Sequence, residues 1–286
     1  MKNKSNRVLK LFFTVPVIIY TITLILIPLL YILFLSFCKS DSYGGVLYQF
    51  NLNNYLTIFN KTYMKILLKS SIIALITTFI CICIAYPFSL FLVEKKEETR
   101  NLMIKLVMIP FLTNSLIRTY GWIVLLRKNG VINNSLINMH LIDKPLELMY
   151  NNLGIIIGMV YTLLPFMILP LHSAVSTIDK YLLEAASDLG ASKWQIFKNI
   201  ILPQTFSALF NGALMVFTPA LGYFFIVDVL GGGKIMILGN LIKNQFLTAR
   251  NWPFGAAISV FLVLITSVLI AIYRKCGGKM DDLGGV

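Results

Sequence analysis

Charged residues are scarce in this chain of 286 residues: they make up 13% of the sequence, whereas hydrophobic residues make up 57%. Soluble domains carry about 25% charged residues, so this composition excludes an ordinary soluble globular protein. The charges are mostly basic and give a formal net charge of +13. Because they are scattered among short loops, with no soluble domain to gather them on one face, they do not indicate nucleic-acid binding.

The sequence also lacks the patterns of an enzyme or a metal site. It contains no Gly-x-x-x-x-Gly-Lys-Ser/Thr phosphate cradle, and Gly231–Lys234 has neither the spacing nor the preceding strand for one. The 4 cysteines are dispersed, and the 2 histidines are isolated from them in the sequence. We therefore expect the cysteines to be small, buried apolar side chains and not metal ligands. No Ser/His/Asp or paired-carboxylate arrangement stands out. We expect a non-catalytic chain that binds no cofactor of its own.

Long apolar runs fill most of the chain. About 20 apolar residues are enough to cross the hydrocarbon layer of a membrane as a helix. We therefore predict an all-α polytopic membrane protein, a single transmembrane domain over residues 1–286 with six transmembrane helices. The predicted spans are residues 11–37, 66–93, 104–126, 154–175, 203–227 and 255–273. The first run is too long for a signal peptide and has no small-residue cleavage site, so it is read as an uncleaved span.

Two of the spans contain residues that lipid would not accept on all sides. The third carries Pro110, Asn114 and Arg118, which must face the protein interior or a wet cavity. The fourth holds Pro165 and Pro170, which predict a broken or bent helix lining a cavity. Between the spans, three outer loops are expected at about residues 38–65, 127–153 and 228–254, the second with an amphipathic piece at Val131–Leu141.

Six spans place both termini on the same side of the membrane. Assigning the termini and the loops at 94–105 and 179–202 to one face collects more than half of the 25 Lys and Arg there. The bias is modest, and by the positive-inside rule it makes that face cytoplasmic.

The segment Tyr181–Pro203 is the longest amphipathic, charged stretch between apolar blocks. Helical spacing of its apolar residues predicts a short helix with an apolar face formed by Leu182, Leu183, Ala186 and Leu189. Gly190 suits the left-handed end of that helix, and Ser192 with Gln195 forms a capping box that begins a second one. Pro203 suits the first turn of a further helix. Two short helices with a bend form a rigid protrusion, a shape for docking.

The same residues carry a resemblance. Glu184-Ala185-Ala186, Gly190 and Ile200-x-Leu202-Pro203 resemble the EAA loop of permease subunits of ABC importers. In that family the loop is cytoplasmic and fits a groove on the ATP-binding subunit. The resemblance implies an ATPase-coupling role for residues on this loop: Glu184, Ala185, Ala186, Asp188, Gly190, Ala191 and Trp194. The alternative is an ordinary helix-turn-helix connector between two spans.

Further stretches of the sequence resemble one branch of the ABC importer permeases. From about Leu52 to Tyr273 the chain is similar to the PotB-type permeases of spermidine/putrescine importers, at Pro110–Gly121, Leu164–Met167, Asp228–Gly232 and Trp252–Ala257. This implies a location in the bacterial inner (plasma) membrane, a second, PotC-like permease and an extracytoplasmic, PotD-like polyamine-binding protein. It also implies a dimer of PotA-like ATP-binding subunits that carries the ATP and Mg. Related permeases for other cargo share such stretches.

One acidic residue is placed to meet a cationic cargo. Asp228 closes the outer end of the predicted fifth span, with Phe224 one helical turn below and Leu221 two turns below. A carboxylate beside aromatic rings suits an organic polycation, through charge pairing and cation–π contact. Further ring surface could come from residues on the third, fourth and fifth spans: Tyr120, Trp122, Tyr161, Tyr223 and Phe225.

Alternatives stay open at each of these positions. Asp228 is equally explained as a solvated turn residue or as a partner of Arg118, and the rings as core packing. Arg118 would repel a polycation from an open path; it could instead tether Asp228, orient a helix or lie away from the path. For the whole chain, the alternatives are an importer of iron, sulfate, thiamine or another small solute, an ATP-independent secondary transporter, and a membrane-embedded enzyme.

Overall fold

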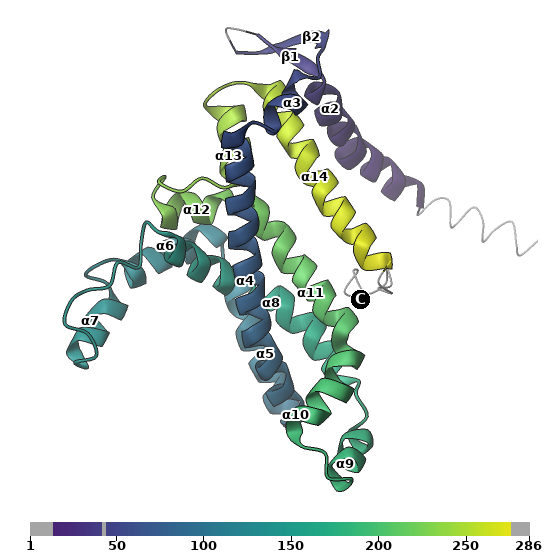
Figure 1. Cartoon of the computed structure of the whole chain (residues 1–286), viewed down its shortest axis with the longest axis vertical. Helices are drawn as coiled ribbons and strands as arrows, with labels where there is room; N and C mark the ends of the chain where they lie inside the picture. Colours follow the sequence, from purple (N-terminus) through teal and green to yellow (C-terminus); the bar gives the residue numbers. More distant parts are fainter. Residues whose placement is uncertain (1–13, 42–43, 276–286) are drawn as a thin grey trace, which may run out of the picture. The chain divides into compact units, whose positions relative to one another are not determined.

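The structure is a computed structural model that describes residues 14–41 and 44–275. The chain forms two compact units, one built from the residues up to Met64 with Leu241–Ile265 and one from Lys65–Asn240 with the residues from Thr266. Figure 1 labels the helices and strands in chain order. The termini, with the start of the predicted first span and Cys276, lie outside the described residues.

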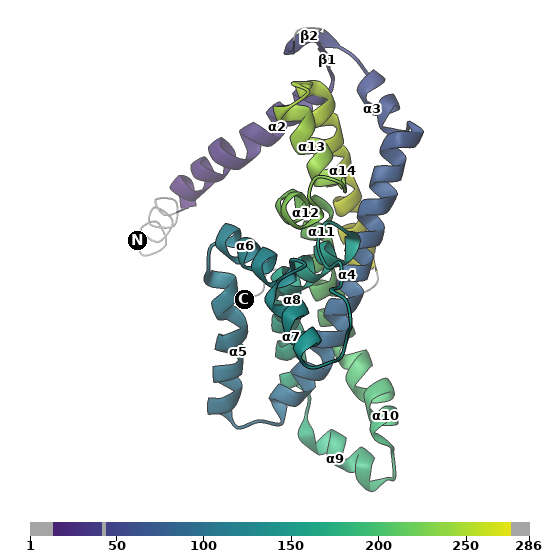
Figure 2. The ribbon, with the colours of Figure 1, turned by 90° about the vertical axis from the view of Figure 1, so that its left-hand side faces the viewer.

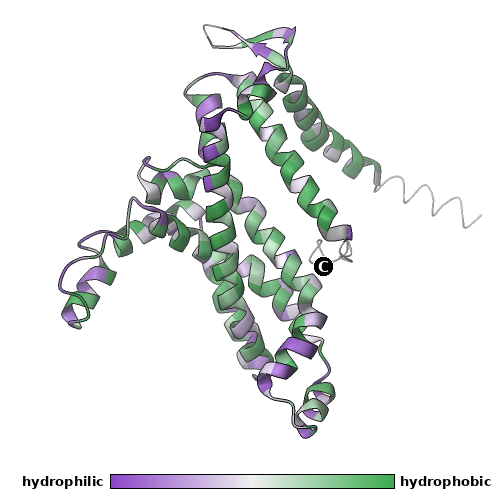
Figure 3. Ribbon diagram, in the orientation of Figure 1, coloured by the Kyte–Doolittle hydropathy of each residue, from purple (hydrophilic) through white to green (hydrophobic). Residues whose placement is uncertain are grey.

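Among residues 14–41 and 44–275, five helices are long and apolar enough to cross a membrane. They are Thr14–Ser36, Lys61–Val93 (α4), Asn152–Ser176 (α8), Lys193–Gly222 and Trp252–Ile272, the last within α14 (Trp252–Lys275). The first contains a π-helical turn at Ile22–Leu26 (η1) before α2 (Ile27–Ser36). Figure 3 shows apolar residues along these helices and polar ones at the turns between them. Each helix overlaps a span predicted from the sequence.

The predicted third span is not one straight helix. It consists of α5 (Glu97–Leu112) and α6 (Ser115–Leu126), and the chain bends by 97° between Glu97–Leu112 and Ser115–Asn138. Asn114 begins α6 because its Oδ1 accepts a hydrogen bond from the N–H of Leu116 at 2.8 Å. Counting this pair as one broken span gives six candidate spans among the described residues, in agreement with the predicted number, whereas the break within residues 104–126 was not predicted (Figure 2).

The predicted fifth span also ends early. Helix α11 (Leu202–Gly222) stops at Tyr223, and a separate short helix, α12 (Phe224–Gly231), follows. The predicted outer loop beyond it contains α13 (Leu238–Leu247), which the sequence analysis missed. Asp228 and Phe224 therefore lie on α12, one turn apart, whereas Leu221 belongs to α11.

The predicted fourth span is a continuous helix, unlike the third and fifth spans. Helix α8 runs without a break through Pro165 and Pro170, so of the predicted alternatives, a broken or a bent helix, the broken one is wrong. Close packing against α11 and α12 supports the helix, because a Cβ on Gly212 would meet Met167 and one on Gly158 would meet Leu230. Membrane helices approach closely where residues are small, and this contact forms the core of the second unit.

The outer loop at residues 38–65 is more regular than predicted. Its strands β1 (Cys38–Ser40) and β2 (Val46–Phe50) pair antiparallel, and a short helix, α3 (Asn53–Ile58), follows. The side-chain amide of Asn54 donates to the carbonyls of Ser36 and Cys38 at 3.1 and 2.8 Å, which ties α3 to the end of the first span. This hairpin is a small exception to the predicted all-α fold. The amphipathic piece predicted at Val131–Leu141 in the next outer loop contains a helix, α7 (Val131–Asn138).

The described cysteines differ in their surroundings. Cys38 and Cys81 are buried, and burial raises the pKa of the Cys38 thiol, so it stays protonated. Cys83 is exposed on α4, so the interpretation as buried filler is wrong for that residue.

Candidate functional site

The coupling loop, as we call residues 179–202, contains the two helices and the bend that its sequence predicts. Helix α9 (Lys180–Asp188) begins where Asp179 accepts a hydrogen bond from the N–H of Tyr181 at 2.9 Å. It ends at Gly190, whose φ of +83° is left-handed and whose N–H donates to the carbonyl of Ser187 at 2.9 Å. The direction of the chain reverses at this glycine.

The second helix of the loop, α10 (Lys193–Ile196), begins with the predicted capping box. The hydroxyl of Ser192 accepts from the N–H of Gln195, and the side chain of Gln195 accepts from the N–H of Ser192 at 2.7 Å. The first turn of a helix leaves backbone N–H groups without intrahelical partners. The N–H groups of Ser192 and Gln195 are both satisfied inside the loop, so the loop holds its shape without a partner.

The surface of the loop is exposed and partly apolar. No residue of α9 is buried, and Tyr181, Leu189 and Trp194 are 79%, 89% and 69% exposed. All seven predicted coupling residues lie on this surface; Glu184, Ala185, Asp188, Gly190 and Trp194 are exposed, and Ala186 and Ala191 are half-buried. Figure 2 shows α9 and α10 projecting from the end of the second unit. Large apolar side chains on an ordered protrusion mark a surface for a protein partner.

The coupling loop is continuous with a membrane span. Helix α10, a π-helical turn at Phe197–Ile201 (η2) and α11 form one helix, Lys193–Gly222, of 30 residues. Pro203 lies in the first turn of α11, as predicted, but α11 continues from α10 and η2 without a break. Proline has no N–H and crowds the preceding turn. The wider π turn, in which the N–H of Leu202 donates to the carbonyl of Phe197, lies directly before it.

The other end of α11 leads to the predicted cargo-path residues. Trp122 of α6 packs edge-on against Tyr161 of α8, with ring centroids 5.2 Å apart. The guanidinium of Arg118 lies over the same Tyr161 ring at 5.9 Å and donates to the carbonyl of Pro110 at 2.7 Å. Of the alternatives for Arg118, the structure supports the orienting role, because these contacts fasten α6 at the break that follows α5.

Asp228 is held by a residue that the sequence analysis missed. Its carboxylate accepts a hydrogen bond from the side-chain amide of Asn240 at 2.6 Å, and the same amide donates to the carbonyl of Phe224 at 3.1 Å. Asn240 is 2% exposed and also accepts from the N–H of Ile237. Asp228 is therefore more than a solvated turn residue: it is part of a clamp between α12 and α13. In the sequence, the one signal for Asn240 was its position as a polar residue next to Gly239.

The remaining predicted path residues do not form one cluster. Tyr223 shares a hydrogen bond with Ser115 at 3.4 Å, across α11 and α6. Tyr120 is 57% exposed and Phe224 41%. The structure thus brings Trp122 and Tyr161 together and sets Asp228 against Asn240, while Tyr120 points outward.

Replacing Asn240 with leucine is expected to lower the unfolding free energy by about 2 kcal/mol, because the Asp228 carboxylate and the Phe224 carbonyl each lose a buried donor. Thermal unfolding of the purified permease in detergent measures this. Asn244→Leu, on the same helix, is the control, because its half-buried side chain has no comparable clamp. Equal midpoints for the two variants would contradict the clamp.

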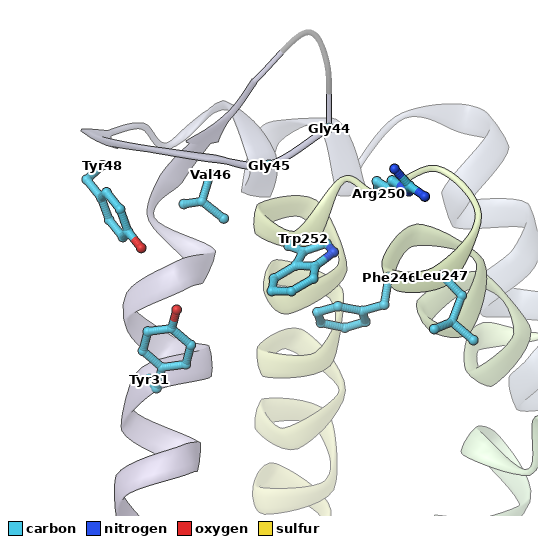
Figure 4. A pocket seen from close by; sticks show the side chains of 9 residues that line it. All are labelled: Tyr31, Gly44, Gly45, Val46, Tyr48, Phe246, Leu247, Arg250 and Trp252. Atoms are coloured by element: carbon cyan, nitrogen blue, oxygen red, sulfur yellow. The ribbon is translucent and has the colours of Figure 1, made fainter.

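In the described part of the chain, two cavities lie away from the predicted cargo-path residues. In the first unit, a cavity of about 530 Å³ is lined by rings from two sides, Tyr31 and Tyr48 on one and Phe246 and Trp252 on the other, with Arg250 at its edge (Figure 4). In the second unit, a cavity of about 620 Å³ gathers Arg127, Lys128 and Lys234 with Glu147. Their described linings are basic, which does not suit a polycation. Aromatic rings at the end of a span are typical of a membrane interface.

The geometry describes a membrane subunit with a docking loop, and comparisons with known proteins agree. The chain belongs to the family of binding-protein-dependent transport system inner membrane components, which it matches over residues 2–279. It is therefore a multi-pass membrane permease subunit of an ABC importer, a non-catalytic component.

Individual relatives cover nearly the whole chain. It is 42% identical over 282 residues to the spermidine/putrescine transport system permease protein PotB of Haemophilus influenzae, with 98% of each chain covered. It is 41% identical over 267 residues to the protein of the same name from Escherichia coli, covering 93% of this chain and 97% of that one. The predicted resemblance is confirmed.

Solved structures support the fold. A bacterial ABC transporter that imports the acidic polysaccharide alginate has a chain that aligns with a TM-score of 0.74 at 16% identity, covering 96% of both chains. A bacterial alginate ABC transporter in complex with an alginate pentasaccharide-bound periplasmic protein has a chain that aligns with a TM-score of 0.76 at 16% identity, covering 95% of this chain and 94% of that one. At this identity the likeness shows the architecture alone.

Proposed function

We propose that this permease carries spermidine and putrescine inward. The observation that carries the proposal is the identity of 41–42%, over nearly the full length, to permeases named for those two cargoes. A permease named for sulfate transport is 29% identical and matches 45% of this chain. Polyamines are therefore favoured over the other small solutes.

The transport cycle needs partners. The exposed apolar face of the coupling loop supports attachment to a PotA-like ATP-binding subunit, which would hold ATP and Mg as one member of a dimer. A second, PotC-like permease would complete the passage, and a PotD-like binding protein would deliver cargo on the outer side. With the coupling loop in the cytoplasm, six spans place both termini there as well.

The mechanism we propose is alternating access. Closure of the ATP-binding dimer would move the coupling loop, and the continuous helix Lys193–Gly222 would carry that movement across the membrane to the break at Tyr223. There, α12 bears Asp228 and Phe224, the predicted carboxylate and ring for a polycation. Movement at one end would thus change access at the other.

A competition assay tests the cargo. The assembled importer, with its binding protein, is reconstituted in liposomes, and uptake of labelled spermidine is measured against excess putrescine, ferric ion, sulfate or thiamine. We expect putrescine alone among these to compete. Uptake of another of these solutes in place of the polyamines would contradict the proposed cargo and leave the importer class intact.

Replacing Glu184 with lysine is expected to reduce transport and binding-protein-stimulated ATP hydrolysis about tenfold, with normal membrane insertion. Glu184 is exposed on α9, so the fold should tolerate the charge reversal, whereas a docked ATP-binding subunit should not. The control is Glu94→Lys, the same change at an exposed position outside the coupling loop. Unchanged hydrolysis in the Glu184 variant would remove that residue from the docking surface.

A further inference from the structure

A line of side chains leads from the exposed surface of the coupling loop into the buried core. The Trp194 ring stacks on the Phe197 ring at 5.5 Å with an angle of 23° between the planes. Phe197 meets the Tyr86 ring edge-on at 5.1 Å. The Tyr86 hydroxyl forms a hydrogen bond with the hydroxyl of Thr205. We call these four side chains the aromatic relay; it links α10, η2, α4 and α11.

Exposure falls steeply along the relay. Trp194 is 69% exposed, Phe197 is half-buried, Tyr86 is 5% exposed and Thr205 is fully buried. The outer end is therefore available to a partner, while the inner end touches only this chain. Because Tyr86 belongs to α4, the relay joins the coupling loop to a second span, beyond the one that continues from α10.

The polar inner end has a defined direction. The Thr205 hydroxyl donates to the carbonyl of Ile201 at 2.8 Å, so the Tyr86 hydroxyl donates to Thr205. Buried hydroxyl groups are costly to leave unpaired, so this chain of bonds fixes where the Tyr86 ring can sit. Ile201 is the last residue of the π turn that begins at Phe197, so Tyr86 contacts the start of that turn directly and its end through Thr205.

We propose that the aromatic relay makes α4 move with α11 when the coupling loop is displaced. Phe197 and Tyr86 are then positioning residues: they touch neither cargo nor nucleotide, and they pass a displacement of α10 to a second membrane helix. Without them a displacement of α10 would still reach α11 and the helices packed on it, but α4 would lose its direct link to the loop. The inference rests on the proposed attachment of the coupling loop to an ATP-hydrolysing subunit.

The test measures coupling separately from assembly. The complete importer carrying Tyr86→Leu or Phe197→Leu is reconstituted in liposomes with its binding protein, and spermidine imported per ATP hydrolysed is determined with the amount of ATP-binding subunit retained. We expect both variants to retain that subunit and to import about fivefold less per ATP, as expected for losing one aromatic contact. Tyr86→Phe keeps the rings and should lose less than about twofold.

A matched control removes a similar ring pair elsewhere. Phe111 and Phe166 meet edge-on at 5.1 Å between α5 and α8, away from the coupling loop. Phe166→Leu is expected to leave the import per ATP unchanged. An equal loss in this control would mean general loosening of the helices and would overturn the relay, as would a wild-type ratio in both relay variants.

A double variant keeps the proposal testable if Tyr86→Leu fails to assemble. Trp194 is exposed, so Trp194→Leu should fold; because Trp194 also lies on the docking surface, import per ATP is compared at equal amounts of retained ATP-binding subunit, where its effect passes through Phe197. Trp194→Leu combined with Phe197→Leu should then lose no more than the larger single loss, whereas multiplied losses would overturn the relay. If the wild-type chain retains no ATP-binding subunit at all, the proposed attachment itself fails.

Discussion

Replacing Gly190 with proline is expected to reduce transport and binding-protein-stimulated ATP hydrolysis by more than about tenfold, while the permease still inserts into the membrane. Gly190 has a φ of +83°, which the proline ring cannot adopt, and its N–H donates to the carbonyl of Ser187. The bend between α9 and α10 must change, whereas the membrane spans are untouched. Uptake by the reconstituted importer and its ATP hydrolysis give the result.

A graded series separates the bend from the substitution. A Cβ at Gly190 would meet nothing within 4 Å, so the cost of a side chain here is backbone strain alone. Gly190→Asn tolerates left-handed geometry and should retain most activity; Gly190→Ala should lose more, since that geometry costs about 1 kcal/mol or more for alanine. Equal activity across the three variants would show that the bend does not matter for coupling.

Replacing Asp228 with asparagine is expected to raise the KM for spermidine about tenfold, with little change in the amount of assembled importer. An asparagine can still accept the hydrogen bond from Asn240, so the clamp between α12 and α13 is retained while the charge is lost. A carboxylate that meets a polycation contributes about 1 kcal/mol or more to binding. Uptake kinetics across a range of cargo concentrations measure the change.

The cargo itself supplies a second comparison. Spermidine is a triamine and putrescine a diamine, so losing a carboxylate from the path should weaken uptake of spermidine more. Asp143→Asn, at an exposed position in the loop before α8, is the control and should behave as wild type. Wild-type kinetics for both cargoes in the Asp228 variant would leave that residue with the clamp alone.

The coupling loop was predictable because its signals are local. Gly190, the Ser192–Gln195 pair and the apolar spacing of α9 each act within one helical turn, and the structure confirms the two helices and the bend. The family followed from the same residues. The roles of the individual coupling residues stay predictions until the variants are measured.

The breaks in the third and fifth spans were not predicted, because apolar length does not distinguish a straight helix from a bent one. The break after α5 depends on Asn114 capping α6 and on Arg118 reaching the carbonyl of Pro110. That contact exists only once the bend is made. In α8 a break or a bend was expected at the prolines, and no break occurs. Prolines that weaken an isolated helix are tolerated there because α11 and α12 pack against it.

The residues missed at the candidate site depend on long-range partners. Asn240 acquires its role from Asp228 and Phe224, which lie on another helix. Tyr86 lies more than a hundred positions from Phe197 and Thr205, in a run that reads as plain membrane helix. Pairing across such distances is decided by how helices pack, which no single stretch of sequence encodes.

Chemical labelling of the coupling loop tests the central claim most directly. A cysteine is placed at Leu189, which is 89% exposed, in a chain whose 4 native cysteines are replaced by serine. A membrane-impermeant thiol reagent should label it in inside-out vesicles but not in intact cells, and bound ATP-binding subunits should protect it. Labelling from outside intact cells, or labelling that the ATP-binding subunits do not change, would contradict the account.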